Sequence, residues 1–211
     1  MWLWISKGGL MMVPILLCSV FAAAIIVERI LFYFFKIKAD SQALLNQILD
    51  YVRKNKISEA VDICEKNPYC MTNVLKAGLV YYEDSRETIK EAIETASLYE
   101  VPKLEKNLNF LNMLASITPL LGLLGTAIGL FKSFYTISQK AIAIGVVAQS
   151  DIAIGLWQSL IVTVSGLSVA LLASVFYQYF VHKVNFYVLE AERAAGELLE
   201  ALSQRRYAGE V

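Results

Sequence analysis

Four polar residues stand in apolar surroundings in the second half of the chain, and they are the side chains best suited to contact an ion. They are Thr126, Gln158, Ser159 and Thr163. Hydroxyl and amide groups can bind an ion, but none of them titrates near neutral pH. No Asp, Glu, His, Lys or Arg lies deep in either of the two apolar runs that carry them. Because a proton relay inside a membrane usually needs such a group, either no ion path runs here or another chain supplies the carboxylate.

Two stripes of small residues accompany these polar groups. The residues recur at steps of three or four, so each stripe falls on one face of a helix. The first stripe comprises Ala115, Thr118, Gly122, Gly125, Thr126, Gly129 and Ser133, and the second comprises Ser159, Thr163, Gly166, Ala170, Ala173 and Tyr177. Small residues let two helix backbones approach closely in a membrane, where apolar burial gives no driving force. Helix packing is therefore expected at Pro119, Gly122, Gly125, Gly129 and Gly166.

A depth estimate puts two of the hydroxyls at similar heights. With the standard helical rise, Thr126 lies roughly 12 Å and Thr163 roughly 14–17 Å from the outer ends of their helices. Both stripes are therefore expected to face each other or a shared cavity. The alternative is that each hydroxyl only bonds the carbonyl four residues before it or a neighbouring helix, which is what such hydroxyls usually do. The residues by themselves leave both interpretations open.

The elements that must hold these residues are three membrane-spanning helices. Hydrophobic residues make up 57% of the chain, and apolar runs cover Gly9 to Phe35, about Leu111 to Phe134, and about Ile152 to Val181. Basic residues are concentrated between the first two runs and after the third. The positive-inside rule therefore puts these two segments in the cytoplasm. The N-terminus and the short connection from Tyr135 to Asp151 are then outside. We therefore predict an all-α membrane protein with three transmembrane helices, long helical cytoplasmic extensions and a cytoplasmic C-terminus.

This topology divides the chain into four segments. Residues 1–35 form a periplasmic head and the first span, 36–110 a helical cytoplasmic insert, 111–181 the second and third spans with their connection, and 182–211 a cytoplasmic C-terminal helix. The insert is expected to hold helices at Ser41–Lys54, Ser58–Lys66 and Thr72–Tyr82. A fourth helix, which Asp84 and Ser85 can cap, is expected from Arg86 through Glu100, and Pro102 is expected to interrupt or kink it. Its charged face either docks a partner or is merely solvated.

One charged pair stands inside an apolar run. Glu28 and Arg29 lie in the last third of the first span. They either pair inside the membrane, or they lie at the headgroup level with their side chains reaching water. Their position near the end of the span favours the second interpretation.

The remaining residues favour no enzyme, metal or nucleic-acid function. The single His has no Cys or Ser partner at a recognisable spacing, and neither GxxxxGK[ST] nor HExxH occurs. Lys and Arg number 19 against 19 Asp and Glu, so net charge suggests no nucleic-acid partner. Cys18, Cys64 and Cys70 form neither a CxxC pair nor an even set, which favours free thiols. No cofactor is expected, and no cleavable signal peptide is recognised before the first span.

The run TPLLGLLGTAIGLF, from Thr118 to Phe131, resembles the signature of the MotA/TolQ/ExbB proton-channel family. Upstream, ETIKEAIETASLYEVPKLEKNLNFLNMLASI resembles the stretch that leads into that helix, and downstream, LWQSLIVTVSGLSVALLAS is similar to the third-helix pattern of the ExbB and TolQ branch. The likeness is close from about Glu83 to Tyr179. A lone GxxxG pair would be weak evidence, but the proline, glycines and threonine together with a second matched helix are specific.

The resemblance implies a multi-pass protein of the bacterial inner membrane that forms a homopentamer around a pair of single-span partners of the ExbD/TolR type. The partner's aspartate is then the protonatable group, and Thr126 and Thr163 face a pore lined by the second and third helices. Ion flow is expected to rotate the pentamer around the partner, so that this channel or stator subunit passes work to the periplasm or outer membrane. The process that is powered, such as siderophore uptake, envelope constriction, gliding or polymer export, stays open.

The sequence departs from the family pattern at two places. Many ExbB and TolQ members carry glutamate where this chain has Gln158, and an amide can form hydrogen bonds but cannot titrate. A role for Gln158 in proton transfer therefore stays open, as does the coupling ion, proton or sodium. The proline that often follows the glycine segment of the third helix is also absent.

Two other functions remain as alternatives. The first is a non-conducting membrane scaffold that docks partners through its cytoplasmic helices. The second is a small-molecule transporter, which is less favoured because three spans are few and no inverted repeat is visible.

Overall fold

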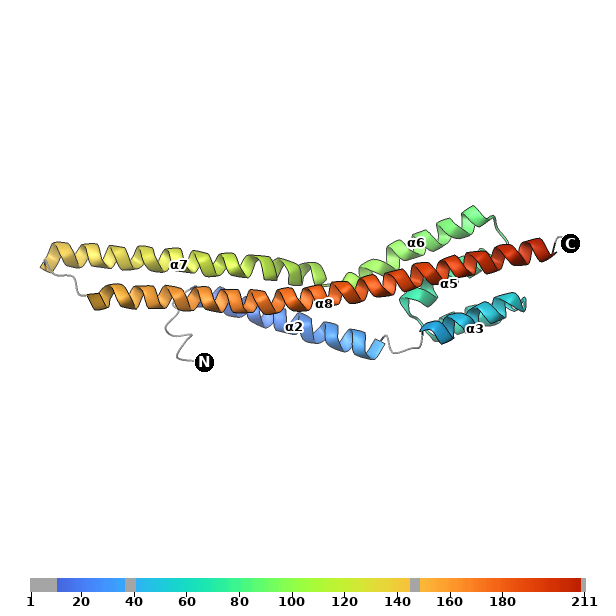
Figure 1. Ribbon diagram of the computed structural model, residues 1–211, viewed down its shortest axis with the longest axis horizontal. Helices are drawn as coiled ribbons and strands as arrows, with labels where there is room; N and C mark the ends of the chain where they lie inside the picture. Colours follow the sequence, from blue (N-terminus) through green and yellow to red (C-terminus); the bar gives the residue numbers. More distant parts are fainter. Residues whose placement is uncertain (1–10, 37–40, 145–148, 210–211) are drawn as a thin grey trace. The chain divides into compact units, whose positions relative to one another are not determined.

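The computed structural model describes residues 11–36, 41–144 and 149–209, and every regular element in these ranges is a helix. The helices are α2 (Met12–Lys36), α3 (Ser41–Arg53), α4 (Ile57–Lys66), α5 (Cys70–Val80), α6 (Arg86–Glu105), α7 (Leu108–Ile144) and α8 (Gln149–Gly209) (Figure 1). The described chain divides into two compact units. Unit 1 holds the residues up to Glu28 together with Asn107–Tyr179, and unit 2 holds Arg29–Lys106 together with the residues from Phe180 onward.

Three helices are long and apolar enough to cross a membrane, which confirms the predicted spans. The candidates are Met12–Tyr33 in α2, Leu108–Lys140 in α7 and Ala153–Gln204 in α8. A helix needs roughly 20 predominantly apolar residues to cross the hydrocarbon core, and each candidate reaches that length. The protein is therefore an all-helical membrane protein. The side of the membrane on which each end lies stays a prediction.

Helices α7 and α8 are longer than the predicted second and third spans. Because α7 continues to Ile144 and α8 begins at Gln149, most of the connection expected from Tyr135 to Asp151 is helical, and residues 145–148 lie outside the described ranges. No Gly or Pro occurs between Phe131 and Ile144, so nothing local stops the helix. The third span and the C-terminal helix likewise form one helix, since α8 contains no proline.

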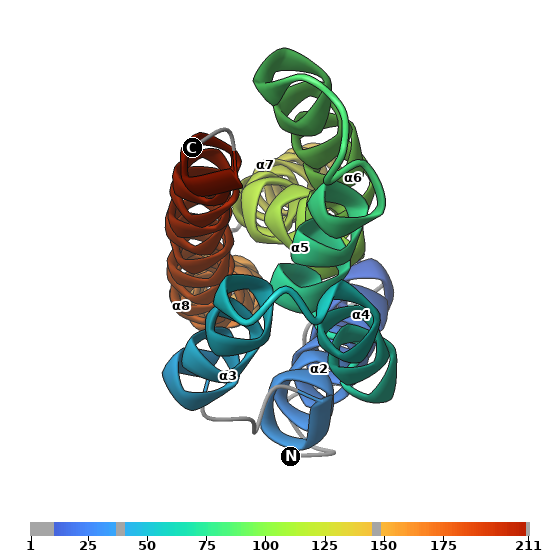
Figure 2. The same ribbon diagram turned by 90° about the vertical axis from the view of Figure 1, so that its right-hand side faces the viewer.

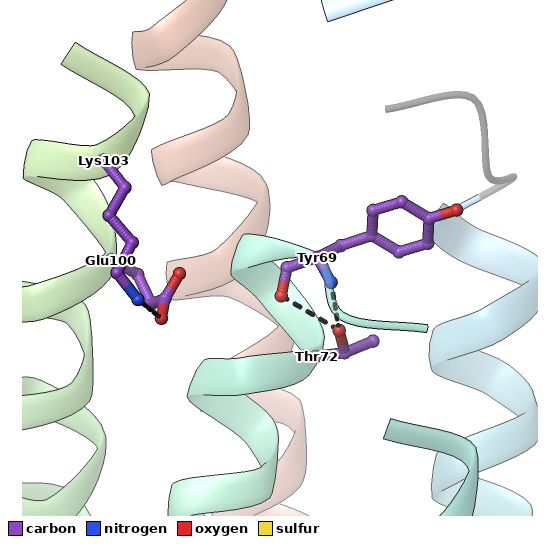
Figure 3. Close-up of polar contacts among 4 residues, drawn as sticks. All are labelled: Tyr69, Thr72, Glu100 and Lys103. Carbon is purple, nitrogen blue, oxygen red and sulfur yellow. Dashed lines mark hydrogen bonds and ion pairs between the residues drawn. The ribbon is translucent and has the colours of Figure 1, made fainter. Parts of the chain in front are cut away.

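The helices of the insert begin and end close to the predicted turns. The break at Asn67–Pro68 separates α4 from α5, and the hydroxyl of Thr72 accepts a hydrogen bond from the backbone N–H of Tyr69 at 2.9 Å at the start of α5 (Figure 3). Ser85 caps α6 as predicted, since its hydroxyl accepts a hydrogen bond from the N–H of Thr88 at 3.2 Å.

Helix α6 does not stop where its proline suggested. It runs through Pro102 to Glu105, and the break before α7 contains Asn107 with a φ of 62°. Asparagine reaches this left-handed conformation at lower cost than most residues. Of the two outcomes predicted for Pro102, the interruption is wrong, because the left-handed Asn107 lies at the actual break, and the kink stays a prediction.

The core of unit 2 joins the insert to the last part of α8. In Figure 2, α3 and α5 are drawn nearer to that part of α8, and α4 lies on their far side. Buried apolar side chains from the insert include Ile48, Val52, Val74, Leu75, Leu79 and Ile93, and those from α8 include Ala191, Ala194, Ala195, Leu198, Ala201 and Leu202. The α8 residues recur at helical spacing and are mostly alanine, so other helices can pack closely against this face. The predicted segments 36–110 and 182–211 thus share one core.

Arg29 is covered by protein, so its side chain does not reach water as the favoured interpretation expected, while its position at the headgroup level stays a prediction. Its exposed fraction is 1%, and its guanidinium lies 5.1 Å from the ring centroid of Phe32. Nη1 of Arg29 and the hydroxyl of Tyr33 both donate to the carbonyl of Leu104, at 3.4 and 2.9 Å. Carbonyls in the last turn of a helix lack helical donors and attract cations, so Arg29 stabilises the C-terminal end of α6.

The three cysteines are free, as predicted. Cys64 is buried in the core of unit 2, while Cys18 and Cys70 are half-buried. Burial raises the pKa of the Cys64 thiol to about 11. Because the thiolate is the reactive form of cysteine, both the burial and the raised pKa slow the reaction of Cys64 at neutral pH.

Candidate functional site

Helices α7 and α8 lie side by side in unit 1 and bring the two predicted stripes together (Figure 1). A Cβ atom built on Gly166 would lie 3.0 Å from both the Cα of Gly122 and the carbonyl oxygen of Thr118. One built on Gly122 would lie 3.4 Å from the Cα of Thr163. The nearest neighbours of these two glycines are therefore backbone atoms, which is the close approach that small residues permit.

The other predicted packing residues differ in their contacts. A Cβ on Gly125 would lie 2.4 Å from Cγ1 of Val162, and one on Gly129 would lie 3.1 Å from Cβ of Ser159, so both glycines face α8. Pro119 is half-buried inside α7 and does not end the helix. Its ring removes the N–H that would bond the carbonyl of Ala115. A packing role for Pro119 stays a prediction.

The hydroxyls of Thr126 and Thr163 are hydrogen-bonded to each other across the α7–α8 interface. This contact agrees with their estimated similar depth. The hydroxyl of Thr126 also reaches the carbonyls of Gly122 at 3.2 Å and Ser159 at 3.3 Å, and that of Thr163 reaches the same two carbonyls at 3.4 and 3.3 Å. Each hydroxyl carries one proton. When one threonine donates to the other, the second can donate to a carbonyl, and the two roles can exchange.

Ser159 and Gln158 lie one turn of α8 away from Thr163, towards the start of that helix. Ser159 is buried, and its hydroxyl donates to the carbonyl of Gly155 at 2.8 Å. Gln158 is half-buried. Both residues line a groove of 450 Å³ between α7 and α8. The structure thus brings Thr126, Thr163 and Ser159 into one hydrogen-bonded cluster and places Gln158 beside it, while their part in an ion path stays a prediction.

The groove has a mixed apolar and polar lining, and no acid is among the described residues that line it. Its lining includes Lys132, Ser133 and Thr136 of α7 together with Gln158 and Ser159 of α8. Among the described residues that line it, Lys132 is the single charged group and none is a carboxylate. Small and polar side chains therefore leave space there for a helix or an ion.

Gly155 is an interface residue that the sequence reasoning missed. A Cβ built on it would lie 1.7 Å from Oγ and 2.6 Å from Cβ of Ser133, and the glycine is buried. The sequence pattern could have identified this glycine, because it lies four residues before Ser159 and extends the second stripe by one turn. The predicted third span began at Ile152, so this glycine stood at the edge of the expected helix.

The two glycines at the backbone contact should respond differently to alanine. Gly166→Ala places a Cβ 3.0 Å from backbone atoms of α7 that no side-chain rotation can move, whereas Gly122→Ala places one at 3.4 Å, an ordinary contact. We expect Gly166→Ala to destabilise the protein by about 1–3 kcal/mol, as overpacking does, and Gly122→Ala to have a smaller effect or none. Thermal unfolding of the purified protein in detergent measures both. Equal losses for the two variants would contradict the contact geometry.

Comparison with known proteins identifies the family. The fold and site define a three-span helical membrane protein whose second and third spans meet along small residues and paired hydroxyls. The model of the MotA/TolQ/ExbB proton channel family matches residues 66–193, which include all of α7 and α8 as far as Arg193. The chain belongs to this family.

Curated relatives agree with its ExbB branch. The chain is 29% identical to the biopolymer transport protein ExbB-like 3 of Synechocystis over 173 residues, which cover 82% of this chain and 81% of the relative. It is 34% identical to the biopolymer transport protein ExbB of Aquifex aeolicus over 123 residues, which cover 58% of this chain and 80% of the relative.

Proposed function

We propose that the chain is the ion-channel, or stator, subunit of an energy-transducing motor in a bacterial inner membrane. The observation that carries this proposal is the hydrogen-bonded contact of Thr126 with Thr163, inside an interface that is rich in small residues. These hydroxyl and carbonyl oxygens lie at one depth and can exchange hydrogen bonds. They could therefore bind an ion in place of its hydrating water, or bind water that carries a proton. No enzymatic step is part of this function.

The titrating group of the motor belongs to a partner chain. The groove beside the threonine pair has no carboxylate among its described lining residues, and Gln158 cannot titrate. A single-span protein of the ExbD/TolR type, with an aspartate inside the membrane, would complete the path. Five copies of the present chain would surround a pair of such partners, with the N-terminus in the periplasm and the insert and the C-terminal helix in the cytoplasm. Proton is the expected coupling ion.

A non-conducting scaffold is the second candidate, and one set of contacts favours it. The hydroxyls of Thr118, Thr126, Ser133, Ser159 and Thr163 each have a bond available to a carbonyl four residues earlier in their own helix. Hydroxyls that serve only packing behave in this way. In that case the glycines hold the assembly together and the cytoplasmic helices dock a partner.

Ion flux in liposomes tests the proposal. The chain is reconstituted with a single-span protein that carries an intramembrane Asp and is encoded beside it, and a pH-sensitive dye inside the vesicles reports proton entry when a membrane potential is imposed. We expect flux that requires both chains and disappears when the partner's Asp is changed to Asn. A sodium-sensitive dye in parallel vesicles identifies the ion. An intact complex that passes neither ion under any potential would favour the scaffold.

A further inference from the structure

Unit 2 contains a cavity of 390 Å³ that involves none of the predicted ion-path residues. All of its lining residues belong to unit 2. The cavity is enclosed by the end of α2, by α3, by the turn that leads into α5, by the last turns of α6 and by α8. Its volume is within the range of sites that bind small molecules or parts of larger ones.

Part of the lining of the cavity is apolar and aromatic. It is formed by Phe32, Leu44, Tyr69, Met71, Leu104 and Tyr187. Aliphatic and aromatic side chains of this kind suit a hydrocarbon chain.

The lining also carries two positive and two negative groups. Glu100 and Lys103 already form an ion pair with an N–O distance of 2.6 Å (Figure 3). Lys106 and Glu190 line the same cavity, and no ion pair within the described part of the chain uses either of them. The cavity therefore offers one cation and one carboxylate to a ligand that carries both charges.

Two lining residues of the cavity lie at or next to the ends of candidate spans along the chain. Phe32 is in the last turn of the candidate span Met12–Tyr33, and Lys106 stands just before the candidate span that begins at Leu108. Glu190 follows the predicted end of the third span at Val181. Hydrocarbon chains and charged headgroups meet at the ends of membrane spans. A ligand with an apolar part and a zwitterionic part is therefore available there.

We propose that this cavity binds the headgroup of a phospholipid that has a primary ammonium, such as phosphatidylethanolamine. Lys106 binds the phosphate, and Glu190 accepts hydrogen bonds from the ammonium. The apolar and aromatic side chains of the lining contact the upper part of an acyl chain. Charge-assisted hydrogen bonds of both signs give selectivity for a zwitterion over an anionic lipid. The proposed topology would place this lipid in the cytoplasmic leaflet. The binding itself does not depend on that topology.

Cys70 provides a reporter for occupancy because it lines the cavity. Burial, and to a lesser degree the negative charge of Glu100, raise the pKa of its thiol to about 11. Alkylation at pH 8 is therefore slow, and its rate rises about tenfold per pH unit below that pKa. The full-length chain in detergent is treated with iodoacetamide, and peptide mass spectrometry measures the modification of Cys70. Cys64 serves as an internal control, since it stays unmodified while unit 2 is folded.

Three additives separate the possible ligands. We expect phosphatidylethanolamine to slow Cys70 alkylation about tenfold at a lipid concentration near ten times the dissociation constant. Phosphatidylglycerol, which lacks the ammonium, and soluble phosphoethanolamine, which lacks the acyl chains, should give little protection. Equal protection by phosphatidylglycerol would overturn the role of Glu190, and equal protection by phosphoethanolamine would replace the lipid by a soluble zwitterion. Protection by none of them would overturn the site.

Matched substitutions test the two contacts. Lys106→Gln and Glu190→Gln should each remove most of the protection, and Lys106→Arg should keep it because the charge is retained. Lys90→Gln in α6 and Glu192→Gln in α8 are controls, since neither residue lines the cavity, and both should be protected like the original chain. Loss of protection in the controls would overturn the assignment. The measurement uses neither partner nor ion gradient. The lipid site can therefore be disproved while the proposed channel function stands, and the channel function can be disproved while the lipid site stands.

Discussion

Gly155→Ala should disrupt the contact between α7 and α8. The new Cβ would lie 1.7 Å from Oγ and 2.6 Å from Cβ of Ser133. The hydroxyl can rotate away, but Cβ of Ser133 is fixed by the backbone of α7, so the helices must shift. We expect a loss of about 1–3 kcal/mol, the usual range for overpacking, or roughly 2–4 °C in Tm for each kcal/mol at this chain length. Thermal unfolding in detergent and the elution volume of the assembly measure the effect.

A second substitution identifies the cause. Ser133→Gly removes both atoms that the new Cβ would overlap. Gly155→Ala should therefore cost much less stability when it is made in the Ser133→Gly variant than when it is made in the original chain. This is a double-mutant cycle, and atoms in direct contact give a coupling of about 0.5–3 kcal/mol. Gly196→Ala is the control, because a Cβ there meets no atom within 4 Å and alanine favours a helix. A loss at Gly155 that Ser133→Gly does not relieve would contradict the contact.

Thr126→Val and Thr163→Val should each reduce ion flux through the reconstituted complex by about tenfold or more, which corresponds to about 1.4 kcal/mol in the barrier. Valine keeps the volume but removes the hydroxyl that joins the two helices and faces the carbonyls of Gly122 and Ser159. Stability should fall much less, because hydrogen bonds between membrane helices average about 0.6 kcal/mol. The double variant should be little worse than either single one, since both substitutions remove the same contact.

Two other hydroxyls provide controls in the same helices. Ser116 and Ser168 are exposed and bond only the carbonyls of Asn112 and Val164 in their own helices, at 3.0 and 2.8 Å. Ser116→Ala and Ser168→Ala should leave flux unchanged. If Thr126→Val and Thr163→Val also leave flux unchanged while the complex stays assembled, the threonine pair is a packing contact and the scaffold is favoured. Flux lost only together with assembly would point to the same conclusion.

Much of the α7–α8 interface was predictable from the sequence. Residues at steps of three or four share a face of any helix, and the helical rise converts residue number into depth. That was enough to expect Thr126 and Thr163 at one height, and the structure places them in contact. The same arithmetic could not rank the glycines. Whether Gly122 or Gly166 is the tighter contact depends on the rotation and separation of two helices, which no local pattern contains.

Other features could not be read from local patterns. Pro102 is a helix-breaking signal, yet α6 continues through it and the break comes at Asn107. Arg29 has the position of a residue that reaches the headgroups, yet its partners include Phe32 and the carbonyl of Leu104, which is far away in sequence. The cavity with Lys106 and Glu190 likewise joins residues of α6 and α8. Each of these outcomes depends on long-range packing that overrides a local preference.

The sequence by itself determined that this is a helical membrane protein with three spans and two stripes of small residues, because hydrophobic length and helical period are local properties of the chain. Its motif also indicated the family to which the chain belongs. Only the tertiary structure decided that the two stripes meet, that Gly155 opposes Ser133, and that the insert shares a core with the end of α8. The physical reason is that contacts between distant segments depend on the register and approach of whole helices, and these are set by the sum of many packing interactions.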